Sequence, residues 1–366
     1  MMHKNSIADE EYFLCLYGVI MKKRKKILLL ATGGTIACKR TEDGLTPQLS
    51  AEELLDYVPE VREFCKVDYI QLFSIDSTNM GPEQWLELSK TIEQKYEYYD
   101  GFVICHGTDT MAYTAAALSY LVQYNRRPIV ITGAQKPIDL PTTDARANLR
   151  DSLRFASDPR AHGVNIVFGG KVVAGTRAKK EYSKSYNAFT SINFPKIAII
   201  QDSRIVFFIN DKDQIPYPLT FYHKLNPNVF LLKLIPGIDG AFLDVIFERY
   251  DAVIIESFGV GGFPDNGDHS FYNSIKKALE NNKVVVMATQ VTNEGSDMSV
   301  YQVGKMMKDK FDLPEAYDMT LEATVTKTMW ALAVAENERE FRELFYQTIN
   351  HDMLFQNLEY TDYIEQ

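Results

Sequence analysis

Short apolar runs alternate with amphipathic stretches through the first two hundred residues of the chain. Runs of this length, rich in Val, Ile, Leu and Phe, are typical of buried strands. Between them, Ser50 and Glu53 have the spacing of a capping box, and Pro82 suits the first turn of a helix. The pattern predicts strands at 27–31, 67–73, 102–105, 129–132, 165–168 and 171–174, and helices at 51–58, 82–98, 111–123 and 143–157.

Strands separated by helices of this length indicate a parallel sheet with crossover helices. Residues 210–228 are rich in Pro, Asp and Asn and have little periodicity, so we interpret them as a linker. The fold class is therefore α/β, with a larger N-terminal parallel-sheet domain at 27–209 and a smaller C-terminal α/β domain at 229–366. In the second domain the pattern predicts strands at 229–234, 252–256 and 283–288, and helices at 271–280, 317–335 and 338–350.

Length and charge support this interpretation. The 366 residues exceed the roughly 250–300 at which single cores stop growing, so two domains are expected. A formal net charge of -10 argues against binding to nucleic-acid phosphates, and we interpret the basic run at 22–26 as a solvated flank of the first strand. No apolar run approaches the ~20 residues of a membrane span. Residues 1–26 are expected to form a poorly ordered extension, and Met21 is a candidate start of translation.

The cysteines and histidines follow no ligand pattern. The chain has 4 cysteines without a CxxC pair and 6 histidines without an HExxH motif. This usage predicts neither a disulfide framework nor a metal site. The apolar stretch at 12–20 precedes the basic run, which is the reverse of the order in a signal peptide, so we expect a cytoplasmic protein.

Candidate chemistry lies in the loops that follow the strands. Parallel sheets bind ligands at the carboxyl ends of their strands, and the loops at 32–37, 74–80 and 106–110 can meet there. Two of these loops present a threonine directly after an apolar run. A threonine hydroxyl becomes a nucleophile when a base removes its proton, and a partly buried lysine amine is a suitable base. The segment 175–180 supplies two lysines after a strand.

Each feature also has a structural interpretation. A Gly-Gly pair after a strand is usually only a turn, and Thr108 or Asp109 before a helix is usually an N-cap. Lys180 is one of many lysines, and His106 is interpreted as a packing residue. The templates GxSxG, GxxxxGK[ST] and GxGxxG after a strand are absent from the sequence. The spacing alone does not decide which of the two threonines attacks.

Two long motifs resemble the signatures of bacterial-type L-asparaginases, most closely the cytoplasmic type I branch. They are Thr32-Gly-Gly-Thr-Ile-Ala37 and His106-Gly-Thr-Asp-Thr-Met-Ala-Tyr113, and the likeness extends over about residues 26–350. The resemblance implies the asparaginase/glutaminase-like fold of two α/β domains, with no cofactor and no metal. It also implies a homo-oligomer of intimate dimers, as a dimer or a homotetramer, in which the partner's C-terminal domain closes the site.

The resemblance assigns roles to matching residues. Thr35 would be the nucleophile, and Thr108 the second hydroxyl of the relay. Asp109 would bind the substrate ammonium group, and Lys180 would be the relay base. The substrate's α-amino and α-carboxylate groups would be held by Asp76 and Ser77.

Two positions depart from the family pattern. Many members carry a tyrosine ten residues past the nucleophile, where this chain has Leu45, so Tyr182 or Tyr186 is a candidate substitute. A known effector pocket of the type I branch uses a threonine and an arginine where this chain has Lys179 and Glu256. Activation by asparagine is therefore not expected.

The function predicted on these grounds is hydrolysis of L-asparagine to L-aspartate and ammonia through a threonine acyl-enzyme. One alternative is an amidotransferase component that acts on charged tRNA, which reuses the same amidase core. Another is a non-catalytic amino-acid-binding protein, which Leu45 favours. Preference for asparagine over glutamine stays open, because one methylene changes discrimination by only ~1–3 kcal/mol.

Overall fold

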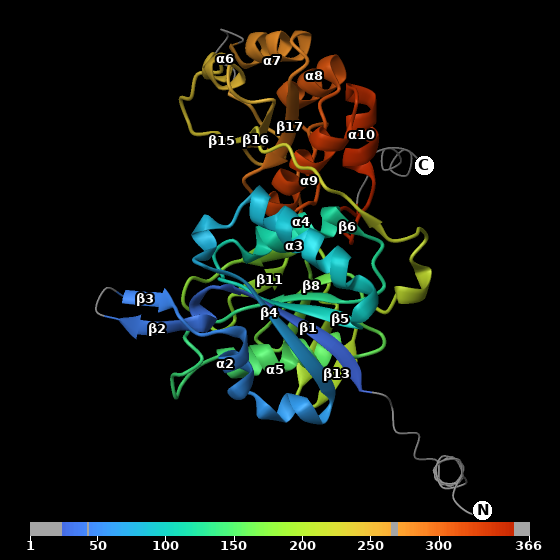
Figure 1. The fold of residues 1–366 in the computed structure, drawn as a ribbon. Coiled ribbons are helices and arrows are strands. Elements are labelled where there is room, and N and C mark those ends of the chain that lie inside the picture. The colour runs from blue at the N-terminus through green and yellow to red at the C-terminus, as the bar shows by residue number, and fades with distance from the viewer. Residues whose placement is uncertain (1–23, 42–43, 265–269, 355–366) are drawn as a thin grey trace, which may run out of the picture.

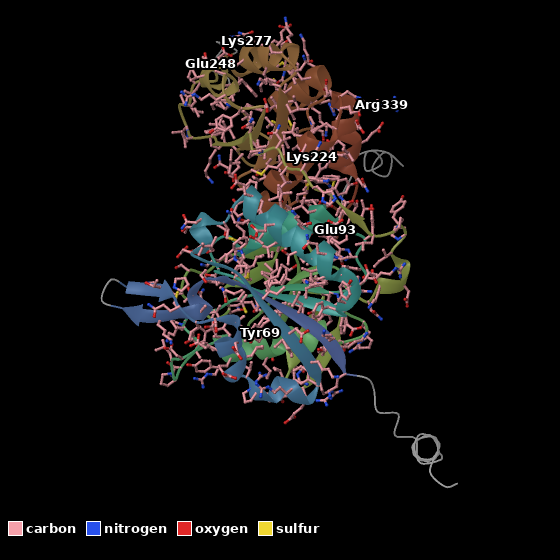
Figure 2. All side chains as sticks on the ribbon, in the orientation of Figure 1. Tyr69, Glu93, Lys224, Glu248, Lys277 and Arg339 are labelled. Carbon is pink, nitrogen blue, oxygen red and sulfur yellow. The ribbon has the colours of Figure 1, made fainter. Side chains whose placement is uncertain are left out.

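The computed structural model describes residues 24–41, 44–264 and 270–354. Figure 1 shows a large lower domain built around one sheet and a smaller upper domain that contains the C-terminal elements. Charged side chains such as Glu93, Lys277 and Arg339 project from the outer surface of both (Figure 2).

The N-terminal domain is built on an eight-stranded sheet in the order β13-β12-β9-β8-β7-β5-β1-β4. Its parallel part is β4 (Cys65–Ile75), β1 (Lys25–Gly33), β5 (Gly101–Cys105), β7 (Ile129–Thr132) and β8 (Val164–Phe168). The other three strands pair antiparallel: β9 (Lys171–Ala174), β12 (Ala198–Gln201) and β13 (Arg204–Phe207). The sheet is thus mainly parallel, as predicted, but its last three strands are not.

Helices cover both faces of this sheet. Along β1, Leu29 belongs to one core cluster, and Leu28 and Leu30 belong to the other. Both faces of the strand are therefore buried, which explains why its sequence is a continuous apolar run. One face packs against α2 (Ala51–Asp56) and α5 (Ala145–Ala156), and the other against α3 (Pro82–Lys95) and α4 (Met111–Leu121).

The C-terminal domain has a three-stranded parallel sheet in the order β15-β16-β17. Tyr120 on α4 stacks on Trp330 of the C-terminal domain with ring centroids 6.0 Å apart, so the two domains share an apolar contact. The strands are β15 (Val229–Lys233), β16 (Ala252–Ser257) and β17 (Val284–Thr289); the helices are α6 (Phe242–Phe247), α7 (Ser270–Glu280), α8 (Gln302–Phe311), α9 (Leu321–Val334) and α10 (Glu338–Tyr346).

Several predicted helices have different ends in the structure, and three of them are informative. The helix predicted at 111–123 ends at Leu121, because the next two residues form β6 (Val122–Gln123) and pair with β14 (Thr220–Phe221). That partner strand comes from the predicted linker, which is therefore not structureless. The helix predicted from residue 317 starts at Leu321 behind its N-cap Thr320. The helix predicted to residue 350 ends at Tyr346.

Several short elements were not predicted from the sequence. Besides α6 and α8, they include the hairpin β2 (Cys38–Thr41) and β3 (Gly44–Pro47), and the ribbon of β10 (Ala178–Lys180) and β11 (Phe189–Ser191). The single turns are η1 (Thr35–Ala37), η2 (Pro59–Glu63), η3 (Ser77–Asn79), η4 (Tyr96–Tyr98) and η5 (Lys212–Gln214).

The described basic residues at the start of β1 have acidic or carbonyl partners. Lys25 lies 3.1 Å from Asp100, and Lys26 lies 2.7 Å from Asp68. The N-terminal extension up to residue 23, with Met21, lies outside the described residues.

Within the described ranges, Cys38, Cys65 and Cys105 are free and buried, and no group of three or more His, Cys, Asp or Glu side chains could hold a metal ion. The same part of the chain contains no helix long and apolar enough to cross a membrane.

Candidate active site

The three predicted loops meet at the carboxyl ends of β1, β4 and β5. The backbone N–H of Gly34 donates to the carbonyl of Ile75 at 3.1 Å. An added Cβ at Gly34 would lie 2.3 Å from the backbone nitrogen of Gly107, and its φ is +76°. Only glycine allows this approach and this conformation, so the loop after β1 rests directly on the loop after β5.

Thr35 begins the single turn η1 immediately after that contact. Thr35 itself is half-buried, whereas the next two residues, Ile36 and Ala37, are buried. The turn therefore holds the Thr35 backbone in place at the edge of the sheet. The sequence predicts Thr35 in a tight turn after a strand, and Thr35 lies in such a turn.

Ser77 links the loop after β4 to the loop after β5. Its carbonyl accepts a hydrogen bond from the Thr110 hydroxyl at 2.7 Å, and its own hydroxyl oxygen lies 3.3 Å from the donating backbone N–H of Asp109. Ser77 is buried, but its neighbour Asp76 is exposed. The Asp76 carboxylate accepts from the backbone N–H of Thr78 at 2.8 Å and so caps η3.

Lys180 completes the cluster from a different part of the chain. Its Nζ lies 2.8 Å from Thr108 Oγ1 and 2.5 Å from Asp109 Oδ1. The Lys180 side chain is 17% exposed and the Asp109 side chain 58% exposed. One amine therefore lies within hydrogen-bond distance of both a buried hydroxyl and a solvent-facing carboxylate.

The route of the chain to Lys180 differs from the one expected. Because β9 runs antiparallel to β8, its carboxyl end lies at the opposite edge of the sheet from Thr108. The chain returns as β10, which lies outside the main sheet, contacts α4 and pairs only with β11 among the described strands. Lys180 is the last residue of that returning strand.

His106 is a buried structural group. The Trp85 indole N–H donates to Thr114 Oγ1 at 2.9 Å, and that hydroxyl lies 2.9 Å from His106 Nε2. Its Nδ1 lies 2.6 Å from the Gly107 carbonyl. These partners assign the proton to Nδ1, and burial lowers the pKa of His106 to about 4. The neutral ring thus fixes the turn that carries Thr108.

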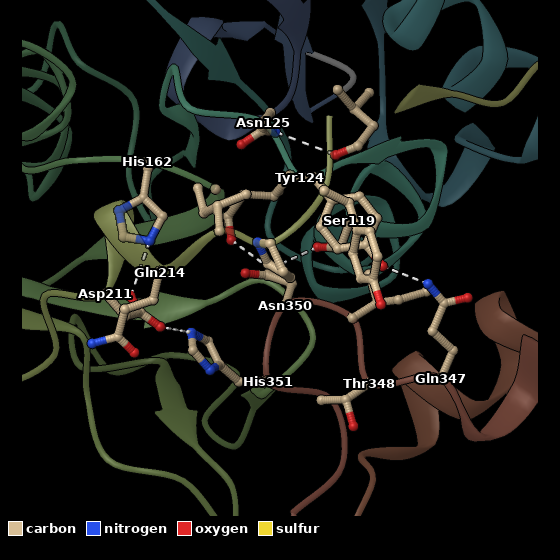
Figure 3. A pocket seen from close by; sticks show the side chains of 17 residues that line it. Ser119, Tyr124, Asn125, His162, Asp211, Gln214, Gln347, Thr348, Asn350 and His351 are labelled. Atoms are coloured by element: carbon tan, nitrogen blue, oxygen red, sulfur yellow. Dashed lines mark hydrogen bonds and ion pairs between the residues drawn. The ribbon is translucent and has the colours of Figure 1, made fainter. Parts of the chain in front are cut away.

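A separate cavity of about 420 Å³ lies where the two domains meet the predicted linker (Figure 3). Asp211 lies between His162 and His351, at 3.0 and 3.4 Å from their Nε2 atoms. None of the six predicted site residues lines this cavity.

Both domains of the chain match known protein families. The asparaginase N-terminal family matches residues 26–213, and the glutaminase/asparaginase C-terminal domain family matches residues 228–345. The chain belongs to the asparaginase family. As a member it is an amidohydrolase, which agrees with the resemblance seen in its two threonine motifs.

Named relatives cover nearly the whole chain. The L-asparaginase of Thermococcus kodakarensis is 37% identical over 88% of this chain and 98% of its own length, and its solved structure has a TM-score of 0.84 over 90% of this chain and 100% of its own. L-asparaginase 1 of Escherichia coli is 30% identical over 90% and 98%. A glutamyl-tRNA(Gln) amidotransferase component from Methanosphaera stadtmanae is 32% identical over 91% of this chain and 78% of its own length.

Proposed function

We propose that this amidohydrolase is an L-asparaginase, which hydrolyses L-asparagine to L-aspartate and ammonia. The observation that supports this most is the contact of Lys180 with both Thr108 and Asp109, next to the loop that bears Thr35. The 37% identity to an L-asparaginase over almost its full length points in the same direction.

In the proposed reaction the Thr35 hydroxyl oxygen attacks the carbon of the substrate's side-chain amide. Its proton passes through the Thr108 hydroxyl toward the Lys180 amine, and the relay then returns a proton to the departing nitrogen, which leaves as ammonia. Water attacks the resulting ester and releases aspartate. Backbone N–H groups near Gly34 can stabilise the oxyanion that forms in each step.

The same cluster offers groups that suit an amino-acid substrate. The carboxylates of Asp76 and Asp109 are exposed, so either can bind an ammonium group. Ser77 directly follows Asp76, and its hydroxyl oxygen lies 3.3 Å from the backbone nitrogen of Asp109. This hydroxyl is the proposed partner of the substrate carboxylate. Because Asp109 also contacts Lys180, substrate binding and the proton relay share one residue.

We further propose that the protein acts in the cytoplasm as a homo-oligomer of intimate dimers, either a dimer or a homotetramer. Exposed apolar side chains on the C-terminal domain, including Ile235, Val291 and Tyr301, are suited to a contact between copies of the chain. Light scattering coupled to gel filtration gives the mass directly. A monomer at micromolar concentration would refute this part of the proposal.

The decisive test is the change Thr35→Ala. We expect it to abolish ammonia release from asparagine while the thermal midpoint stays close to that of the wild type. Thr220→Ala removes a hydroxyl from β14, remote from the site, and serves as the matched control. Substantial turnover in Thr35→Ala would remove Thr35 from the role of nucleophile. Tight asparagine binding by the wild type without ammonia release would indicate a binding protein instead.

The similarity to several glutamyl-tRNA(Gln) amidotransferase components favours a second candidate function, the amidase part of a tRNA-dependent amidotransferase. This function would require charged tRNA or a partner protein for full activity. Ammonia release measured with and without tRNA separates the two candidates. A rate on free asparagine that does not respond to tRNA excludes the amidotransferase function.

A further inference from the structure

A buried arginine lies three residues before Lys180. Arg177 has no exposed surface, and its guanidinium donates to the Asp318 carboxylate at 2.9 Å and to the Asp318 backbone carbonyl at 2.7 Å. Its Nε also donates to the carbonyl of His351. Arg177 belongs to the N-terminal domain, whereas both acceptor residues lie in the C-terminal part of the chain.

Neighbouring hydrogen bonds add to this contact between the N-terminal domain and the C-terminal part of the chain. Thr176 donates its hydroxyl proton to the Asn350 carbonyl at 2.5 Å, and its own carbonyl accepts from the Thr320 hydroxyl at 2.8 Å. On the other side of the junction, both carboxylate oxygens of Asp318 accept from the backbone N–H of Leu354, at 3.0 and 3.2 Å. The Asp318 carboxylate is therefore fixed by the backbone of Leu354 while it accepts from Arg177.

The exit of the β10–β11 ribbon is attached to the same residue. Asn193 follows β11, and its side-chain amide donates to the Asp318 carbonyl at 3.0 Å. The backbone N–H of Ile192 donates to the Arg177 carbonyl at 2.9 Å. The entry to the ribbon at Arg177 and its exit at Asn193 are thus both bonded to Asp318, whereas Lys180 and its partner Phe189 form the opposite end of the ribbon.

This arrangement matters because the ribbon lies outside the eight-stranded sheet. A strand advances about 3.3 Å per residue, so Lys180 lies about 10 Å along the chain from Arg177. Thr108 and Asp109 belong instead to the loop after β5. The distance from the Lys180 amine to Thr108 therefore depends on where the ribbon is anchored.

We propose that Arg177, through its buried pair with Asp318, is a positioning residue that sets Lys180 against Thr108 and Asp109. The inference rests on the proposed function, in which Lys180 is the relay base. The C-terminal domain of the same chain then takes part in the reaction indirectly, because it provides the fixed point for the ribbon.

The chemistry of the pair supports a geometric role. A buried ion pair often contributes little more to stability than well-packed apolar residues would, since both charges lose their hydration. A guanidinium does, however, impose direction, because its planar fork binds a carboxylate and a carbonyl at fixed angles. Lysine at position 177 would keep the charge and lose that fork.

The test compares Arg177→Lys and Asp318→Asn with Tyr120→Phe. The control removes the Tyr120 hydroxyl that donates to Asp352 at 3.0 Å, another buried bond between the two domains, without touching the ribbon. Misplacement of a catalytic group by about 1 Å costs up to about 100-fold, so both test variants should lose about 10- to 100-fold in kcat with little change in KM. Their pH–rate profiles should also change. Tyr120→Phe should lower only the thermal midpoint.

A second measurement does not depend on turnover. The rate at which an amine-selective reagent modifies Lys180, followed by peptide mass spectrometry over a range of pH, should rise in Arg177→Lys and stay at the wild-type value in Tyr120→Phe. If Arg177→Lys is not recovered folded, Asp318→Asn gives the same readouts. Wild-type kcat, pH profile and labelling in the test variants would overturn the positioning role. A wild type that releases no ammonia would refute the proposed function, and the labelling would still decide the positioning role.

Discussion

The amine of Lys180 lies 2.8 Å from the hydroxyl oxygen of Thr108, although 72 residues separate them in sequence. The same amine lies 2.5 Å from the carboxylate of Asp109. One side chain from the β10–β11 ribbon thus meets two consecutive residues of the loop after β5. This contact gives the proposed proton relay its geometry.

Replacing Lys180 tests the relay directly. Loss of a general base typically lowers the rate by about 10²- to 10⁴-fold, so we expect Lys180→Met to lose kcat on that scale. The adjacent Lys179 points to the other side of the strand, where its amine lies 4.0 Å from Glu322. Lys179→Met is therefore the matched control and should keep wild-type kcat. Near-wild-type turnover in Lys180→Met would refute the assignment.

Replacing Asp76 separates substrate binding from structure. Asn caps a helix about as well as Asp, so Asp76→Asn should change the free energy of unfolding by less than about 0.5 kcal/mol. It removes the negative charge proposed to bind the substrate ammonium group, and KM should rise about 10- to 100-fold. Steady-state kinetics and urea unfolding provide the two values. An unchanged KM would exclude Asp76 from substrate binding.

Replacing Gly34 tests the contact between the two threonine loops. Gly34 and Gly237 both have positive φ, at +76° and +83°, but a Cβ at Gly237 would meet nothing within 4 Å. Gly237→Ala should therefore cost only about 1–2 kcal/mol of unfolding free energy, from backbone conformation alone. Gly34→Ala adds a clash with Gly107 and should cost more than about 4 kcal/mol. Equal losses in urea unfolding would show that the loops can separate freely.

Much of this site could be predicted from the sequence. The apolar runs predict the parallel strands, and the rule for carboxyl ends then places Thr35, Asp76, Ser77, Thr108 and Asp109 along one edge of the sheet. The rule applies because each of these residues lies in the loop just after the end of β1, β4 or β5. For these residues, the local sequence pattern that predicts the strand also predicts the place of the residue in the fold.

Lys180 and Arg177 show where such reasoning ends. The sequence places Lys180 after a strand but does not reveal that β9 runs antiparallel, so the return path along β10 could not be predicted. Arg177 looks like one more charge in a polar segment. Arg177 is buried together with its partner Asp318, which lies 141 residues further along the chain. A local sequence pattern cannot predict a contact between residues so far apart. Likewise, β6 forms only because β14 pairs with it.

His106 leads to a prediction about stability and pH. Burial lowers its pKa from 6.5 to about 4, so between these values the unfolded chain binds a proton there and the folded protein does not. The folded protein has its full free energy of unfolding, as far as His106 contributes, above pH 6.5. It loses this contribution as the pH falls toward 4. The loss reaches about 3 kcal/mol, because each pKa unit corresponds to about 1.4 kcal/mol. Urea unfolding at a series of pH values measures it.

The matched pair of variants for this experiment is His106→Gln and His223→Gln. Other groups also titrate in this range, including His351, whose pKa burial lowers, so the comparison is between slopes and not absolute stabilities. His106→Gln should flatten the dependence of unfolding free energy on pH between 6.5 and 4, because the titrating ring is gone. His223 has a 61% exposed side chain, so His223→Gln is the control for the loss of an imidazole elsewhere on the protein. A wild-type slope in His106→Gln would mean that His106 is already protonated in the folded protein, and the neutral tautomer that holds the Gly107 carbonyl would then be wrong.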